Sequence, residues 1–435
     1  MNNTPQVSET NSVSFLSMFD NRLRPKGSRD PLGSEAVWGN LGRRLVGNLT
    51  TVTSNLDNFI VAILSCDYAH SDLTEKAQVS DITQIQERFA RMEQLLAYVR
   101  LSFVKATEQQ GVLGITKAKA RLNNDVINLG LAYPLLTNQL SMGLWGYYSP
   151  AMARANLLEL DNRKLLDVGL RVVYDFKNEM GIAWDILCKM ADKGEFETLS
   201  IQGIATEVED VFYNPSLRKS FVDALIEHNA NCTAQSQLYI YAKNYISKSK
   251  EDDLKWRAFL RGLVQCNEPQ LSEPSNNIIK VEPLLVINNH VFNWLQGQHD
   301  KPKKAIIAEL ESCMNVYELD IPNINFPHQS FLKKSAELLN RCTESKDNNE
   351  KSHKATCEYL DHLLKYHHDI MKGRHGAPWI EFRDNKLFVR VVSTSGKLPT
   401  AEDGFHALSL KIENSYFLHS FLSIAKQGVS KEVLV

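Results

Sequence analysis

One apolar stripe between residues 82 and 104 constrains the fold of this chain more than any other feature of its sequence. The stripe follows the three- and four-residue spacing of an α-helix, and charged residues such as Glu87 and Arg88 lie off it. Its members are Ile85, Phe89, Met92, Leu95, Leu96, Val99 and Phe103. Segments with the same periodicity follow one another from residue 34 to residue 264. The sequence therefore predicts a mainly α-helical protein whose helices pack on one another.

The order of these segments predicts two folded regions after a polar leader. They are a disordered leader at residues 1–33, a helical domain at 34–266 and a smaller α+β region at 283–435. The leader is rich in Asn, Ser and Thr and has too few apolar residues to form a core. Residues 267–282 hold Pro269 and Pro274 among polar side chains, which indicates a linker between the two regions.

A β-hairpin is predicted in the C-terminal region, from the β-branched and aromatic segments Trp379–Phe382 and Leu387–Val392. A helix ends just before it at Gly373, and Arg374 and His375 follow directly. At such a junction the two side chains can bind an anionic group, because loops on a rigid scaffold often carry function. They can equally fix the junction by hydrogen bonds to backbone carbonyls, which is the interpretation that we favour.

Residues 134–180 have the order of elements of a winged helix-turn-helix. Ser149-Pro150 is a good helix start, residues 157–166 read as a short hairpin, and a helix resumes at Val168. In this interpretation four side chains are candidates for DNA contact: Arg154 and Asn156 for base edges, and Arg163 and Lys164 for phosphates. Winged folds also bind proteins, so the fold alone does not decide the function.

Two basic clusters precede this region. Arg22, Arg24, Lys26 and Arg29 lie among Pro and Gly residues in the leader, and Arg43 and Arg44 lie in the first helical segment. The leader cluster is either a solvated arm or an arm that clamps a partner or a phosphate backbone. The whole chain has 49 basic and 51 acidic residues and a net charge of −2, so it has no general attraction to nucleic acid. Any DNA contact must come from a local patch.

A histidine-rich helix contains the densest group of side chains that bind metals. They are His353, Cys357, Glu358, Asp361, His362, His367, His368, Asp369 and His375. No HExxH or HxxEH spacing is present, and a metal site needs three or four converging ligands. His367 falls on the apolar face of the helix, where a packed histidine is the simpler interpretation. We expect a solvated helix face and no bound metal, and keep a metal-dependent nuclease or hydrolase as an alternative.

The usual signatures of enzymes are missing from the sequence. It contains no GxxxxGK[ST] loop, no GxGxxG after a strand and no GxSxG elbow. The paired carboxylates Asp252-Asp253 and Glu402-Asp403 lie in polar, loop-like surroundings. We therefore expect a chain without a catalytic site and without a cofactor.

The seven cysteines and the N-terminus indicate where the chain works. The cysteines are odd in number and scattered, and no CxxC pair occurs, which is typical of reduced thiols in the cytoplasm. The first residues lack the basic and apolar parts of a signal peptide, and no apolar run is long enough to cross a bilayer. We expect a cytoplasmic protein with no membrane contact.

Three segments resemble an uncharacterised bacterial family encoded in mobile, defence-type gene clusters. They are residues 30–39, beginning Asp30-Pro31-Leu32-Gly33, Gly143–Tyr147, and Asn414–Phe417. The resemblance implies a phage-defence setting and assigns no role to any residue. The missing catalytic signatures, the near-neutral charge and the amphipathic helices lead us to expect a non-enzymatic adaptor or structural subunit of a bacterial multi-protein system, associated with DNA. The first alternative is a winged-helix DNA-binding regulator.

Overall fold

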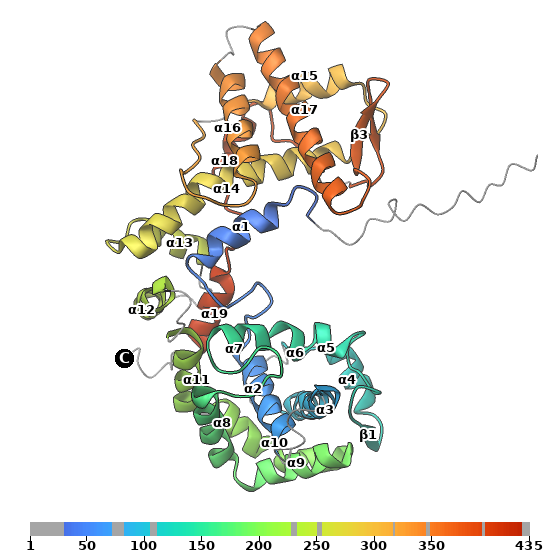
Figure 1. The fold of residues 1–435 in the computed structure, drawn as a ribbon, viewed down its shortest axis with the longest axis vertical. Helices are drawn as coiled ribbons and strands as arrows, with labels where there is room; N and C mark the ends of the chain where they lie inside the picture. Colours follow the sequence, from blue (N-terminus) through green and yellow to red (C-terminus); the bar gives the residue numbers. More distant parts are fainter. Residues whose placement is uncertain are drawn as a thin grey trace, which may run out of the picture. The chain divides into compact units, whose positions relative to one another are not determined.

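The structure, a computed structural model, is mainly helical and contains two small antiparallel two-stranded sheets (Figure 1). It describes residues 30–71, 82–104, 111–227, 233–249, 255–315, 318–344, 349–393 and 396–428. None of the described helices combines the length and the apolar character that a membrane-spanning helix needs. The mainly α-helical class predicted from the sequence is confirmed.

The chain divides into two compact units that differ from the expected domains at 34–266 and 283–435. Unit 1 contains the described residues up to Trp38 and those from Ile279 to Glu413, whereas unit 2 contains those from Gly39 to Ile278 and those from Asn414 onward. Helices α1 and α14 each run across a boundary between the units; they span Ser34–Arg43 and Pro269–Leu295.

Helices α2 (Leu56–His70) and α3 (Ile82–Leu101) form the centre of unit 2. Helix α2 is mostly apolar and is buried on every side, since all its residues from Leu56 to Cys66 are buried, Asp57 and Asn58 among them. A helix of this kind has no face for solvent and must be surrounded by other elements. Helix α3 matches the predicted helix over most of its length, and its apolar stripe packs against α2. The two helices are the scaffold for the rest of the unit.

Shorter elements complete unit 2. They are α4 (Ile115–Arg121), β1 (Val126–Asn128), α5 (Gln139–Met142), α6 (Leu144–Tyr147), α7 (Ser149–Arg154), α8 (Asp167–Met180), α9 (Ile182–Lys193), β2 (Glu195–Glu197), α10 (Thr198–Phe212), α11 (Pro215–Val222), the π-helix η2 (Asp223–Glu227), α12 (Thr233–Lys248), α13 (Trp256–Val264) and α19 (Leu418–Gly428). Strands β1 and β2 pair antiparallel with Ile127 opposite Phe196. Helix α19 packs on α11, α12 and α13, so the C-terminal helix belongs to unit 2.

Unit 1 is built on α16 (Gln329–Glu344) and α17 (Asn349–Gly373), which pack along each other, with α15 (Lys303–Cys313) and α18 (Gly404–Ser409) beside them. The predicted hairpin is present as β3 (Ile380–Arg383) and β4 (Lys386–Val389). Its turn residues Asp384 and Asn385 both have positive φ, at 48° and 59°. This conformation matches the twist of the flanking strands, and Asp and Asn tolerate it better than most residues do.

The structure does not confirm the winged helix expected at 134–180. Helix α7 lies at the expected place, but the hairpin after it is reduced to one bridge between Leu158 and Leu165. Around this bridge the N–H of Glu159 donates to the carbonyl of Lys164. The N–H of Leu166 also donates to the carbonyl of Leu157 at 3.0 Å, but a single bridge is not a pair of strands, so a wing at residues 157–166 is not confirmed.

The expected linker at 267–282 is helical from Pro269 onward, as the first part of α14. Pro269 is tolerated because the N–H that proline lacks has no partner in the first turn of a helix, whereas Pro274 lies beyond that turn. Residues 30–33, the end of the expected leader, are also ordered by contacts. Leu32 is buried in unit 1, and both carboxylate oxygens of Asp30 accept N–H groups at the start of α1, from Ser34 and Glu35.

Candidate functional site

Helix α8 packs into unit 2 along one side only. Val172, Phe176 and Met180 are buried there, and the ring of Phe176 lies edge-on to Phe221 of α11 at 6.2 Å. Gly169 allows a close approach, because a Cβ at this position would lie 2.1 Å from the carbonyl oxygen of Leu157. These contacts hold α8 firmly and determine which of its residues face outward.

The outer side of α8 carries a row of exposed apolar residues. Leu170 and Tyr174 lie four residues apart, so their side chains lie one above the other on the helix surface, and Leu166 is the residue just before the first turn of α8. Their exposed fractions are 37%, 48% and 68%. Single exposed apolar residues are common on proteins, but a contiguous row on one helix is typical of a surface that binds a partner.

A row of charged residues runs beside the apolar row. Asp167, Arg171, Asp175 and Glu179 repeat at the same spacing and are all exposed. No side chain in the described part of the chain forms an ion pair or a hydrogen bond with any of these four. We call the seven residues of the two rows the α8 surface. It combines an uncovered apolar row with charges that have no internal role.

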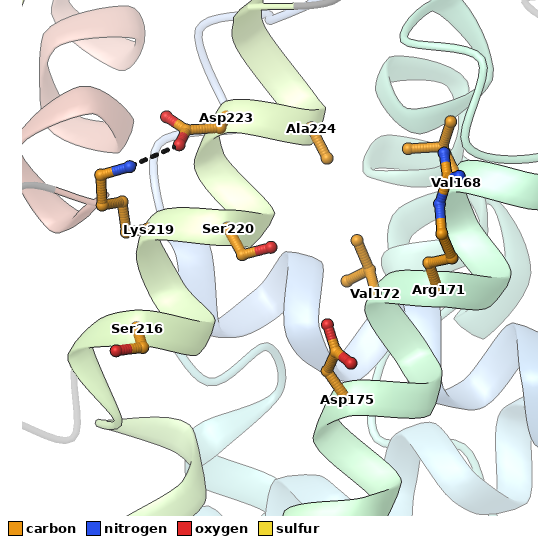
Figure 2. A pocket seen from close by; sticks show the side chains of 9 residues that line it. All are labelled: Val168, Arg171, Val172, Asp175, Ser216, Lys219, Ser220, Asp223 and Ala224. Atoms are coloured by element: carbon orange, nitrogen blue, oxygen red, sulfur yellow. Dashed lines mark hydrogen bonds and ion pairs between the residues drawn. The ribbon is translucent and has the colours of Figure 1, made fainter.

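A groove of about 590 Å³ separates α8 from α11 and η2 (Figure 2). It is lined by Val168, Arg171, Val172, Asp175, Ser216, Lys219, Ser220, Asp223 and Ala224. Asp175 and Ser220 point toward the space between the helices, whereas Lys219 turns away and forms an ion pair of 2.9 Å with Asp223. The floor is apolar and the rim is polar, which suits binding of a side chain from another molecule.

A second groove, of about 480 Å³, lies on the opposite side of the same helix. Leu170 and Tyr174 line it, together with Lys177, whose ammonium is held by Asp67 at 2.8 Å. Arg171 and Asp175 line both grooves. The α8 surface is therefore a ridge with a hollow along each side.

The α8 surface lacks the parts of a catalytic centre. The hydroxyls of Ser216 and Ser220 have no histidine among the residues that line the groove with them, so no general base is in place to activate either one. In the described ranges no three His, Cys, Asp or Glu side chains are grouped so that they could hold a metal ion.

Two of the residues expected to contact DNA form contacts within the chain. The Nη1 of Arg43 donates to the carbonyls of Val46 (3.2 Å), Gly47 (3.2 Å) and Leu49 (2.5 Å), and the guanidinium lies 4.0 Å from the ring centre of Phe417. Arg43 therefore closes the backbone after α1 within unit 2.

Arg163 is held in the same way. Its Nε donates to the hydroxyl of Ser149 at 2.6 Å, and its guanidinium lies 4.8 Å from the ring centre of Trp145. Partial burial lowers the pKa of Arg163. These contacts fix the 157–166 turn on α6 and α7.

The other candidates for DNA contact remain predictions. Arg154, Asn156 and Lys164 are exposed and close in sequence, and Asn156 has a positive φ of 57°. Arg44 is half-buried and interacts with other residues. The leader cluster of Arg22, Arg24, Lys26 and Arg29 lies outside the described residues.

Arg374 and His375 complete the end of α17. The Nη1 of Arg374 donates to the carbonyl of Asp30 at 2.5 Å, and the N–H of Gly376 donates to the carbonyl of Met371 at 2.8 Å. His375 has the left-handed conformation, with φ 56°, that ends many helices. The geometry supports the role of these residues in fixing the helix end.

The ligand-type residues of α17 have other partners. His353 pairs with Glu311, Glu358 with Arg341, Asp361 with Lys303, and His362 with the carbonyl of Phe331. His367 is buried between two backbone groups: its Nδ1 bonds the carbonyl of Pro31 at 2.9 Å, and its Nε2 accepts the N–H of Trp379 at 2.8 Å. Burial lowers the pKa of His367 to about 4, so the ring is neutral.

Reasoning from the sequence missed the α8 surface. The helix itself was predicted from Val168 to Met180, but its apolar residues were not divided between an inner and an outer face. One signal was present: apolar residues at 166, 170 and 174 lie off the row formed by Val172, Phe176 and Met180. A helix with two apolar faces needs two sets of partners.

No protein-family model matches the sequence, and no curated protein and no solved structure is significantly similar to the chain. Its function must therefore be inferred from its own residues.

Proposed function

We propose that this chain is a protein-binding subunit, a non-enzymatic adaptor or structural component of a multi-protein assembly. The observation that carries the proposal is the exposed row of Leu166, Leu170 and Tyr174, which forms a ridge between two grooves. Tyrosine on such a surface is typical of protein interfaces, because it buries a large apolar ring and keeps a polar tip. Charged residues without internal partners beside the row add specificity.

The proposal extends to an assembly of the bacterial phage-defence type that is associated with DNA and works in the cytoplasm. Its support is the resemblance of the three segments described above and the scattered cysteines. Direct DNA binding by the chain is a separate possibility, for which exposed Arg154 and Lys164 are the described candidates. Such binding would fall steeply with rising salt concentration, because it releases counterions from the phosphates.

The experiment is affinity purification of the tagged protein from its native cell, with and without nuclease, read by mass spectrometry. We expect one or more protein partners that stay bound at a fixed ratio after nuclease treatment. Partners that are lost with the nucleic acid, together with salt-sensitive DNA binding by the purified chain, would replace the adaptor by a DNA-binding regulator. Recovery of the chain alone in both samples, together with no DNA binding by the purified chain, would contradict both functions.

A further inference from the structure

We infer that the α8 surface docks an amphipathic α-helix of a partner protein whose apolar stripe is bordered by lysines and arginines. This inference rests on the proposed function and names the chemistry of the partner. It follows from three properties of the surface: the spacing of its apolar row, the grooves beside that row, and the sign of the charges next to it.

The spacing fits a helix. Residues four apart form a ridge along a helix surface, and two helices pack when the ridge of one enters a groove of the other. Leu170 and Tyr174 form such a ridge along the first half of α8, and Leu166, the residue just before the helix, extends it to about 12 Å at 1.5 Å per residue. The grooves of about 590 and 480 Å³ on its two sides leave room for the side chains of the docked helix.

The charges beside the apolar row indicate which partner helix fits. Asp167, Asp175 and Glu179 oppose one Arg171, so three carboxylates and one guanidinium give the row a net charge of −2. An interface places charges of opposite sign across from each other, and like charges facing each other disfavour binding. Lysines or arginines at four-residue spacing on the partner would meet the carboxylates.

The same charges argue against three other occupants. A second copy of this chain, docked through α8, would set two acidic rows side by side. Nucleic acid and an acidic membrane surface are both negatively charged and would be repelled. A basic helix of another protein satisfies the apolar row and the charged row together.

The test is site-specific photo-crosslinking in the native cell, with the photoreactive amino acid p-benzoylphenylalanine in place of Tyr174. Tyr174 is 68% exposed, so the aromatic replacement does not disturb the packing of α8. The control carries the same amino acid in place of Ile240, which is 52% exposed on α12. We expect the Tyr174 position to crosslink a segment of another protein with a basic, amphipathic helical pattern, and the Ile240 position not to crosslink that segment.

A second step measures the charges. A synthetic peptide with the sequence of the crosslinked segment should bind the purified full-length chain. The double substitution Asp175→Lys with Glu179→Lys should weaken binding of the peptide by about tenfold or more. Each exposed ion pair contributes a modest amount to the affinity, and charge reversal adds repulsion. A peptide whose lysines and arginines are replaced by glutamate should recover binding to this variant. Equal melting temperatures of the variant and the wild type exclude misfolding as the cause.

Three results would overturn the inference: a crosslink only to a second copy of the chain, a crosslinked segment without basic residues, or a peptide affinity that the charge reversal leaves unchanged. The proposed function fails separately. Substitutions of Leu170 and Tyr174 could abolish co-purification of the partners while no basic helix is crosslinked. In that case the adaptor function is supported and the inference of a basic partner helix is contradicted. If these substitutions release no partner and no crosslink forms, both fall.

Discussion

The carboxylate of Asp57 and the guanidinium of Arg218 form a buried ion pair of 2.7 Å between α2 and α11. A second guanidinium, that of Arg100 on α3, lies 3.5 Å from the other oxygen of Asp57 and donates to Asn58 at 2.6 Å. One buried carboxylate thus serves two buried arginines. The group links three helices of unit 2, and nothing in the sequence pattern singled it out.

Replacing Asp57 by Ala should destabilise unit 2 severely. Removal of one partner of a buried pair costs about 3–5 kcal/mol, because the remaining charges stay buried without compensation. The measurement is urea unfolding of the full chain, with Lys219→Ala as the control. Lys219 is exposed, so loss of its pair with Asp223 should cost less than about 1 kcal/mol. If the two substitutions lowered the free energy of unfolding by the same amount, the buried pairing of Asp57 with Arg218 and Arg100 would be contradicted.

Glu93 should make unit 2 less stable as the pH rises. Burial raises the pKa of Glu93 from 4.5 to about 7, although the N–H of Leu144 and the amide of Gln139 both donate to its carboxylate. Between these two pH values the folded chain binds more protons than the unfolded chain. The stabilising contribution is therefore complete below pH 4.5 and is lost as the pH rises through 7.

Glu93→Gln keeps the shape of the side chain and cannot titrate. Melting temperatures of the wild type should fall relative to those of this variant between pH 5 and about 8. Parallel profiles of the two proteins would contradict the raised pKa.

His367 should make unit 1 less stable as the pH falls, which is the opposite pH dependence to that of Glu93. The pKa of His367 in the fold is about 4, below its ordinary 6.5, so the unfolded chain binds more protons between these values. The contribution of this group is complete above pH 6.5 and is lost as the pH falls through 4. Protonation of Nε2 would also break the bond that it accepts from the N–H of Trp379.

The measurement is urea unfolding of the wild type and of His367→Asn across this pH range. We expect a loss of stability toward pH 4 that the variant lacks, whatever its absolute stability. A loss of the same size in both proteins would assign the acid sensitivity to other groups.

Arg43→Ala should lower the free energy of unfolding by about 2 kcal/mol and should not specifically weaken nucleic-acid binding. The change removes three hydrogen bonds to backbone carbonyls and the contact with the ring of Phe417. Lys164→Ala is the control, since Lys164 is exposed and its substitution should change the stability by less than about 0.5 kcal/mol. If Arg43→Ala leaves the unfolding midpoint unchanged and weakens DNA binding, the nucleic-acid interpretation of Arg43 returns.

Periodicity predicted those parts of the fold whose shape depends on their own residues. The helix at α3 and the hairpin of β3 and β4 were both predicted, because a seven-residue apolar stripe and a turn at Asp384-Asn385 are local signals. Pairing between distant segments of the chain was not predicted. Val126–Asn128 forms a strand with Glu195–Glu197, a partner about seventy residues away that no local pattern reveals.

Residues that act through distant partners could not be assigned from the sequence. Arg43 and Arg163 looked like basic residues available for DNA, and their carbonyl and aromatic partners became visible only in the folded chain. The exposure of Leu170 and Tyr174 has the same origin. Whether an apolar helix face is core or surface depends on which other helices cover it, and the sequence of the helix does not record that.

The most direct test of the proposed function compares partner recovery between two variants. In the first, Leu170→Asp and Tyr174→Asp introduce charge into the exposed apolar row; in the second, Ile240→Asp introduces charge at a similarly exposed position of α12. Each tagged protein is purified from its native cell after nuclease treatment, and partners are quantified by mass spectrometry. We predict that the first variant loses the partners by tenfold or more while the second retains them, at equal melting temperatures. Full retention by the first variant would contradict the assignment of α8 as the binding surface.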